Sequence, residues 1–147
     1  MAGVTATIEL EGMNEVQRRL GGLSAFDRGE TMLEIGELLA SSTKERIDTE
    51  KASPDGEDWL PWTERYDDTR NHAKHSLLIE EGGLQESIQA YSTSDEVRVG
   101  SNLIYAATHQ FGDEERGIPA RPYLGLSDVD REDISDLILG DLSDAVR

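Results

Sequence analysis

Apolar residues recur with helical spacing in the first third of the chain, between residues 27 and 50. Asp27, followed three residues later by Glu30, is typical of a capping box at a helix start. The apolar positions that follow share one helical face: Met32, Ile35, Leu38, Leu39 and Ile47. The pattern predicts a long helix that ends at about Glu50, with three acidic residues facing solvent: Glu34, Glu37 and Glu45.

A second amphipathic helix is expected near the C-terminus. Ser127 and Asp130 repeat the capping-box spacing at its start. The apolar residues after them lie on one helical face: Ile134, Leu137, Ile138 and Leu142. This spacing predicts a helix that packs on the rest of the domain through that face.

Shorter elements are expected between and before these helices. Val97 and Val99 alternate with charged residues, which predicts a hairpin over residues 89–100 with its turn at Ser92–Asp95. Residues 82–88 predict a turn that opens a brief helix. At the N-terminus, a strand over Thr5–Leu10 and a short helix over Asn14–Leu20 are expected.

Strands and helices mixed without regular alternation predict the α+β class. The length of 147 residues favours a single domain over 1–147. We expect a small mixed or mainly antiparallel sheet, packed by the long helix of the N-terminal half and by the C-terminal amphipathic helix.

The hydrophobic periodicity breaks down at about residues 51–76, which predicts a long loop. Structureless loops of that length are uncommon in compact domains and tend to be functional. The run Ser53–Gly56 has the residue types of a tight turn, and the only two tryptophans, Trp59 and Trp62, follow it. Tryptophan at such a place fits either the edge of the core or an interface with another protein.

The charge balance narrows the possible functions. The chain has 31 acidic and 14 basic residues, a formal net charge of −17, and no cysteine. Such a surface repels DNA phosphates, so specific nucleic-acid binding is not expected. Two explanations of the acidity remain open: adaptation to a very salty cytoplasm, and a surface that lets DNA pass without sticking. No membrane span or signal peptide is expected.

Catalytic chemistry has little support in the residue pattern. His72 and His75 have a spacing that would fit a metal site on one helix face, with Glu80 or Glu81 as a third ligand. His109 lies in a stretch that predicts a packed helix ending at Gly112. A metal-dependent hydrolase that uses the three histidines and an acidic DNA-mimic inhibitor stay as alternative functions.

Several motifs, taken in order, resemble those of a known family. They are Ser53–Gly56 with Trp59, Gly83-Leu84 with Ser87-Ile88, Val97–Gly100 leading to Tyr105-Ala106, His109–Gly112, and Ile118–Gly125. This order and spacing are similar to those of the tailed-phage virion morphogenesis family, which comprises the Mu-like tail completion proteins. The resemblance covers residues 51–126, and the predicted flanking helices suit the family.

The resemblance implies a non-enzymatic structural protein without a cofactor, which acts in tail completion or head–tail joining as a tail terminator or neck protein. It further implies a homo-oligomeric ring of about six copies around the DNA path. Its expected partners are the tail tube protein, a head–tail adaptor or both. A ring of that size would carry a charge on the order of −100, so DNA would pass without specific binding. The protein is expected in the tail or neck of the virion, after assembly in the host cytoplasm.

A subunit interface is expected on the loop with the tryptophans and on the Pro-Ala-Arg-Pro stretch. Prolines on both sides of Arg121 restrict the backbone, so the guanidinium could pair with a neighbour's carboxylate at low entropic cost. Pairing of Arg121 within its own chain is the alternative. The candidate interface residues are Trp59, Trp62, Phe111, Arg121 and Tyr123.

Overall fold

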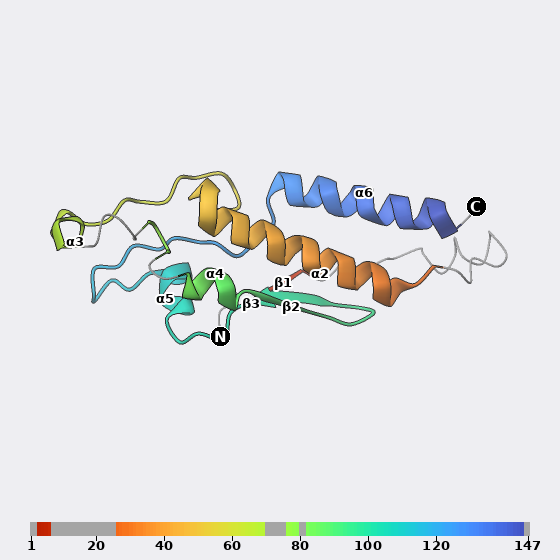
Figure 1. The fold of residues 1–147 in the computed structure, drawn as a ribbon, viewed down its shortest axis with the longest axis horizontal. Coiled ribbons are helices and arrows are strands. Elements are labelled where there is room, and N and C mark those ends of the chain that lie inside the picture. Colours follow the sequence, from red (N-terminus) through yellow and green to blue (C-terminus); the bar gives the residue numbers. More distant parts are fainter. Residues whose placement is uncertain (1–2, 7–25, 70–75, 80–81, 146–147) are drawn as a thin grey trace.

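Three antiparallel strands form the sheet, in the order β1-β3-β2. The computed structural model describes residues 3–6, 26–69, 76–79 and 82–145 (Figure 1). The strands are β1 (Gly3–Ala6), β2 (Gln89–Ser92) and β3 (Val97–Gly100). The predicted hairpin is therefore confirmed, and Val97 and Val99 are buried while Arg98 is exposed. Residues 7–10 of the expected first strand, and the expected helix over residues 14–20, lie outside the described part.

The long helix α2 (Arg28–Glu45) crosses one face of this sheet, and α6 (Asp128–Ala145) packs on the far side of α2 (Figure 1). The side chain of Asp27 accepts a hydrogen bond from the Glu30 backbone N–H at 3.1 Å, which confirms the predicted helix start. Because the sheet and α6 both cover α2, this helix is the middle layer and contributes Met32, Ile35 and Leu39 to the core. The α+β class and the expected packing of two long helices are confirmed.

The last turn of the predicted first helix is a π-helix, η1 (Arg46–Glu50), instead of an α-helix. It ends at Lys51, which has φ 54°. The Lys51 Nζ donates to the carbonyl oxygens of Ile47 at 2.5 Å and Leu77 at 2.9 Å. Burial lowers the pKa of this amine. A lysine thus satisfies a carbonyl at the helix end and joins it to the segment around Leu77.

The capping box of α6 forms as the sequence predicts. The Asp130 backbone N–H donates to Ser127 Oγ at 3.0 Å, and the Ser127 N–H donates to Asp130 Oδ2 at 2.9 Å. Ile134 is buried, and the apolar residues after it on the same face are half-buried: Leu137, Ile138 and Leu142. Because this face packs against α2, the opposite face of α6 is exposed to solvent and consists mostly of charged residues.

One buried ion pair connects three parts of the fold. Arg46 and Asp130 are 1% and 3% exposed, and Arg46 Nη2 lies 3.1 Å from Asp130 Oδ2. Arg46 Nη1 also donates to the Tyr123 carbonyl oxygen at 2.8 Å. Burial alone would raise the pKa of Asp130, but hydrogen bonds from Ser42 and Ser127 and the charge of Arg46 together lower it.

The segment after α5 (Ala106–Phe111) forms an elbow, residues 112–126, that is fixed to its own chain. Gln110 Oε1 accepts the backbone N–H groups of Tyr123 and Leu124, both at 3.0 Å. The Arg121 N–H donates to the His109 carbonyl oxygen at 2.8 Å. Asp113 and Ile118 pair through two backbone hydrogen bonds of 2.8 Å, which close a short hairpin with residues 114–117 at its tip.

The region at residues 51–76 contains more structure than the sequence predicts. Ala52 and Asp58 form an isolated antiparallel bridge around the predicted turn, and α3 (Glu64–Thr69) follows. The brief helix predicted after residue 82 is α4 (Gly83–Ser87). A tight turn and a helix of only six residues are too short to show a periodic pattern of apolar residues, so the sequence pattern did not predict them.

Asp130→Asn removes the negative charge that faces Arg46 and keeps the size of the side chain. We expect it to lower the free energy of unfolding by about 3–5 kcal/mol, because a buried guanidinium loses its counter-charge. Urea denaturation followed by circular dichroism measures the change. Asp133→Asn, at an exposed position of the same helix, is the matched control and should change the free energy by less than about 0.5 kcal/mol. Equal losses in the two variants would contradict the role of the pair.

The same pair predicts a pH dependence of stability. The pKa of Asp130 is lower in the folded state than in the unfolded state, so its contribution is fully present above the unfolded pKa. That contribution is lost as the pH falls through the folded pKa. The difference in unfolding free energy between wild type and Asp130→Asn should be constant from neutral pH to about pH 5 and shrink below it. A difference that grows on acidification would refute this assignment.

Gly112→Ala tests the elbow. Gly112 has φ 75°, and a Cβ there would lie 2.7 Å from the Ala120 nitrogen and 2.8 Å from the Ile118 oxygen. We expect the free energy of unfolding to fall by about 2–4 kcal/mol, because the strain of a left-handed backbone and the overlap of the new Cβ with backbone atoms both destabilise the folded state. Gly117→Ala is the matched control, since Gly117 has φ 68° but open space around it, and should cost only about 1 kcal/mol. Thermal unfolding of both variants gives the comparison, and equal costs would exclude the overlap.

Candidate interaction site

A groove of about 740 Å³ opens at the end of the molecule where α3, α4, α5 and the elbow meet. Its described lining combines aromatic side chains, Trp62, Tyr66 and Tyr105, with two arginines, Arg116 and Arg121. Although 31 of the 147 residues of the chain are acidic, none of the described residues that line this groove is Asp or Glu. We call this feature the acid-free groove, a name that refers to its described lining alone, since Glu80 and Glu81 lie outside the described residues.

Arg121 is the buried cation of the acid-free groove. The residue is 5% exposed, its Nε donates to the Leu60 carbonyl oxygen at 2.8 Å, and its Nη2 donates to that of Pro61 at 2.9 Å. No carboxylate pairs with it within the described part of the chain. Burial lowers the pKa of the guanidinium. A desolvated positive charge with only carbonyl partners favours an incoming anion.

His109 lies on α5 beside this arginine. Its Nδ1 is buried with no hydrogen-bond partner, and its ring meets that of Tyr105 edge-on at a centroid distance of 5.8 Å. Burial, and then the positive charge of Arg121, lower the pKa of His109. The imidazole is therefore neutral at neutral pH and packs in the wall of the groove.

The proposed metal site cannot be assembled from the described residues. His72, His75, Glu80 and Glu81 lie outside them. Within the ranges that the structure describes, no group of three or more His, Cys, Asp or Glu side chains is placed to hold a metal ion. The described ranges also contain no helix that is both long and apolar enough to span a membrane.

The five candidate interface residues fall into two groups. Trp59 and Tyr123 are 6% and 0% exposed, and their polar atoms bond within the chain: Trp59 Nε1 to the Pro122 oxygen and Tyr123 Oη to the Ala106 oxygen, both at 2.8 Å. For Trp59, the structure thus supports the core alternative. Arg121 bonds within its own chain but lines the groove.

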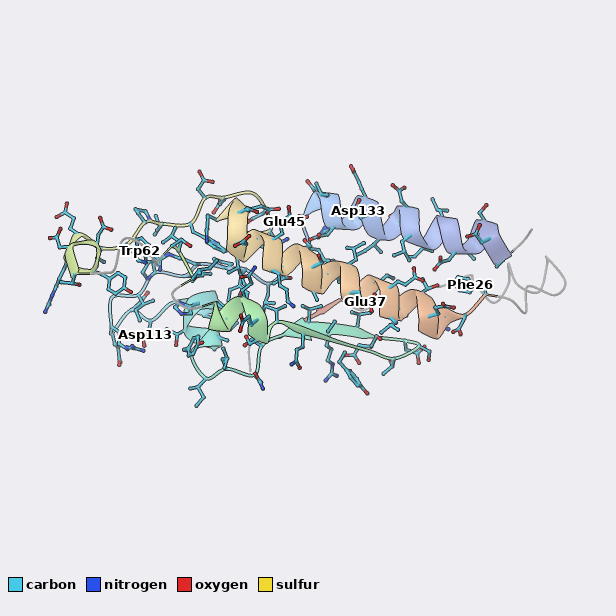
Figure 2. The ribbon with its side chains drawn as sticks, viewed as in Figure 1. Phe26, Glu37, Glu45, Trp62, Asp113 and Asp133 are labelled. Carbon is cyan, nitrogen blue, oxygen red and sulfur yellow. The ribbon has the colours of Figure 1, made fainter. Side chains whose placement is uncertain are left out.

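The other two candidates reach the surface. Phe111 is 70% exposed, and Trp62 is half-buried with its ring centroid 5.9 Å from that of Tyr66. Figure 2 shows Trp62 near α3, at the same end of the molecule as Asp113 of the elbow. The role of all five residues in a subunit interface stays a prediction.

Sequence reasoning missed two features of this end. Ile104, directly before α5, is 97% exposed although its neighbour Leu103 is half-buried. Arg116 was not singled out, yet it lines the groove with a side chain that is 68% exposed. The sequence gives no signal for Ile104, because an apolar residue in an irregular segment has no periodicity from which its exposure follows. The sequence does contain one signal for Arg116, because it is the one arginine that follows three acidic residues at the tip of the elbow, residues 113–115.

The exposed side of α2 and α6 is strongly acidic. Among the residues exposed on α6 are Asp128, Glu132, Asp133, Asp136 and Asp144. Repulsion from Asp141, burial, and repulsion from Glu30 and Glu37 raise the pKa of Glu34 on α2. Like charges are therefore crowded where these two helices meet.

Comparisons with known proteins identify relatives in phages and prophages. The model of the phage virion morphogenesis family matches residues 9–143. The G protein of Escherichia phage Mu, whose name describes it as a candidate capsid assembly protein, is 30% identical over 145 residues, which cover 92% of this chain and 93% of the Mu protein. G protein 2 of the Mu-like prophage FluMu of Haemophilus influenzae is 44% identical over 62 residues, 39% of this chain and 45% of that protein.

An uncharacterised protein of Methanocaldococcus jannaschii is 29% identical over 72 residues, which cover 45% of this chain and 53% of that protein. No solved structure is significantly similar to the chain. The family match includes α2, the hairpin, α5, the elbow and most of α6. Because it extends over most of the sequence, the chain belongs to the phage virion morphogenesis family, and its role is in virion assembly.

Proposed function

We propose that this protein completes the tail or joins head to tail as a structural component of the virion, and that it works as a ring of about six copies around the DNA path. The single observation that carries the proposal is the family match over residues 9–143. The protein acts by fitting against copies of itself and against the tail tube protein or a head–tail adaptor. No reaction is catalysed in this role.

The acidic helices support the passage of DNA. Charged side chains gather on the exposed side of α2 and α6, and the net charge is −17. A channel lined by such surfaces repels the phosphate backbone, so DNA moves through it without being held. In the proposed ring, the exposed acidic side of α2, with Glu30, Glu37 and Glu45, faces the DNA path.

The crowding of carboxylates also supports a host with a salty cytoplasm. The raised pKa of Glu34 reports repulsion among Glu34, Asp141, Glu30 and Glu37. At an ionic strength of about 1 M the Debye length falls to roughly 3 Å, so most of this repulsion is screened. A surface of this kind costs stability in dilute buffer and little in molar salt.

Deletion of the gene from a phage that encodes this protein tests the virion role. We expect the yield of infectious particles to fall by orders of magnitude, because heads and tails no longer combine. Electron microscopy of the lysate then separates two roles: overlong tails indicate a tail terminator, and tails of normal length that lack heads indicate a neck protein. Purified protein added to the lysate should restore infectivity. Normal, infectious particles without the gene would refute the proposal.

Thermal unfolding at increasing KCl concentration tests the adaptation to salt. We expect the midpoint to rise by several degrees between about 0.1 M and 2 M KCl, since screening removes repulsion. Glu34→Gln should be more stable than wild type by roughly 0.5 kcal/mol at low salt and lose this advantage at high salt. A midpoint that is unchanged or lower in KCl would refute the salt adaptation and leave the virion role untouched.

A further inference from the structure

Copies of a chain with a charge of −17 repel one another, so an assembly of them needs a local contact between unlike surfaces. The acid-free groove is a surface of the required kind. Its described lining carries Arg116, Arg121 and the neutral His109, and no carboxylate. Asp113 lies just outside this lining, with its Oδ2 3.9 Å from Arg116 Nη1, whereas Arg121 has no such neighbour among the described residues. A stretch of negative surface on a neighbouring copy would be attracted there.

The buried guanidinium of Arg121 gives the acid-free groove a built anion site. A guanidinium has five N–H donors, and the described bonds of Arg121 to Leu60 and Pro61 use its Nε and Nη2. The residue is 5% exposed, so its charge is poorly hydrated. A carboxylate that approaches such a group supplies the counter-charge that no described residue of its own chain supplies.

The outer side of α6 has the complementary character. Four exposed residues at positions i, i+3, i+7 and i+10 share one helical face, the outer stripe: Val129, Glu132, Asp136 and Leu139. The two apolar residues are 64% and 63% exposed and enclose the two carboxylates. Apolar ends around acidic centres match a groove with aromatic walls and arginines.

We propose that the outer stripe of α6 on one copy docks into the acid-free groove of the next copy. The inference rests on the proposed ring and names its subunit contact. The helices that contribute to the groove, α3, α4 and α5, lie at one end of the molecule, whereas α6 lies over α2 (Figure 1). Because the two surfaces are different parts of one chain, the contact can repeat head-to-tail, and this repetition closes a ring when the rotation between copies permits.

A charge-reversal experiment tests the contact with two exposed positions. Arg116 and Asp136 are both exposed, so Arg116→Glu and Asp136→Arg should fold as the wild type does, which circular dichroism and melting temperature verify. Self-association is measured by sedimentation, at the lowest KCl concentration at which the wild type is folded. Each variant alone should associate at least about tenfold more weakly, since like charges then face each other.

Complementation provides the sharper readout. In an equimolar mixture of the two variants, the glutamate in the groove of one meets the arginine on α6 of the other, and the unchanged groove meets the unchanged α6. Both contacts are then attractive, so the mixture should assemble as the wild type does. The double variant in one chain should recover as well. Reversal at Glu45, an exposed acidic position of α2 outside both surfaces, should leave association unchanged.

Different failures have different consequences. Single variants that assemble like the wild type, or a mixture no better than its components, would overturn the contact and leave a ring built otherwise. A monomeric wild type that still restores infectious particles would overturn the contact but keep the virion role. Normal self-association of Arg116→Glu with loss of particle rescue would assign the groove to a different virion protein, and so would also overturn the contact.

Discussion

The guanidinium of Arg46 is the interaction on which the rest of the structure depends. It is fully buried, it pairs with Asp130 at the start of α6, and it holds the carbonyl of Tyr123 in the elbow. One side chain at the end of α2 thereby fixes the position of two segments that are distant in sequence. A buried ion pair contributes little net stability but strongly disfavours any arrangement that separates its partners. The elbow and α6 are therefore placed relative to each other by charge as well as by packing.

That placement determines the character of the groove. Anchored by Tyr123 and by the side-chain oxygen of Gln110, the elbow presents Arg121 to the cavity while prolines on both sides restrict its backbone. Trp59 and Tyr123 are buried in the core, where each donates a hydrogen bond to a backbone carbonyl. Ile104 and Phe111, at and before α5, remain exposed at this end of the molecule. A chain of high net charge thus keeps a small region in which negative surface is attracted.

The elements of the fold follow closely from the sequence, because each long one has both a periodic apolar face and a capping signal. Asp27 with Glu30 and Ser127 with Asp130 begin their helices as their spacing predicts, and the alternation at Val97 and Val99 gives the central strand. Family membership could be anticipated from the order of the loop motifs. The sequence predicted an α-helix to the end of residues 46–50, whereas the structure has a π-helix there. The Lys51 side chain that follows it bonds to Leu77, which is distant in sequence, so no local pattern indicates this end.

The sequence by itself determined which segments become helices and strands, the high negative charge and the family, since these depend on local spacing and composition. Only the tertiary structure decided which polar and aromatic residues are buried. Side chains such as those of Arg46, Trp59 and Arg121 also occur on protein surfaces. In this fold they are buried, because carbonyl groups of distant segments accept their hydrogen bonds in the interior. The tertiary structure also determines which residues line the acid-free groove. Its lining comes from α3, α4, α5 and the elbow, and no local pattern shows that these segments converge.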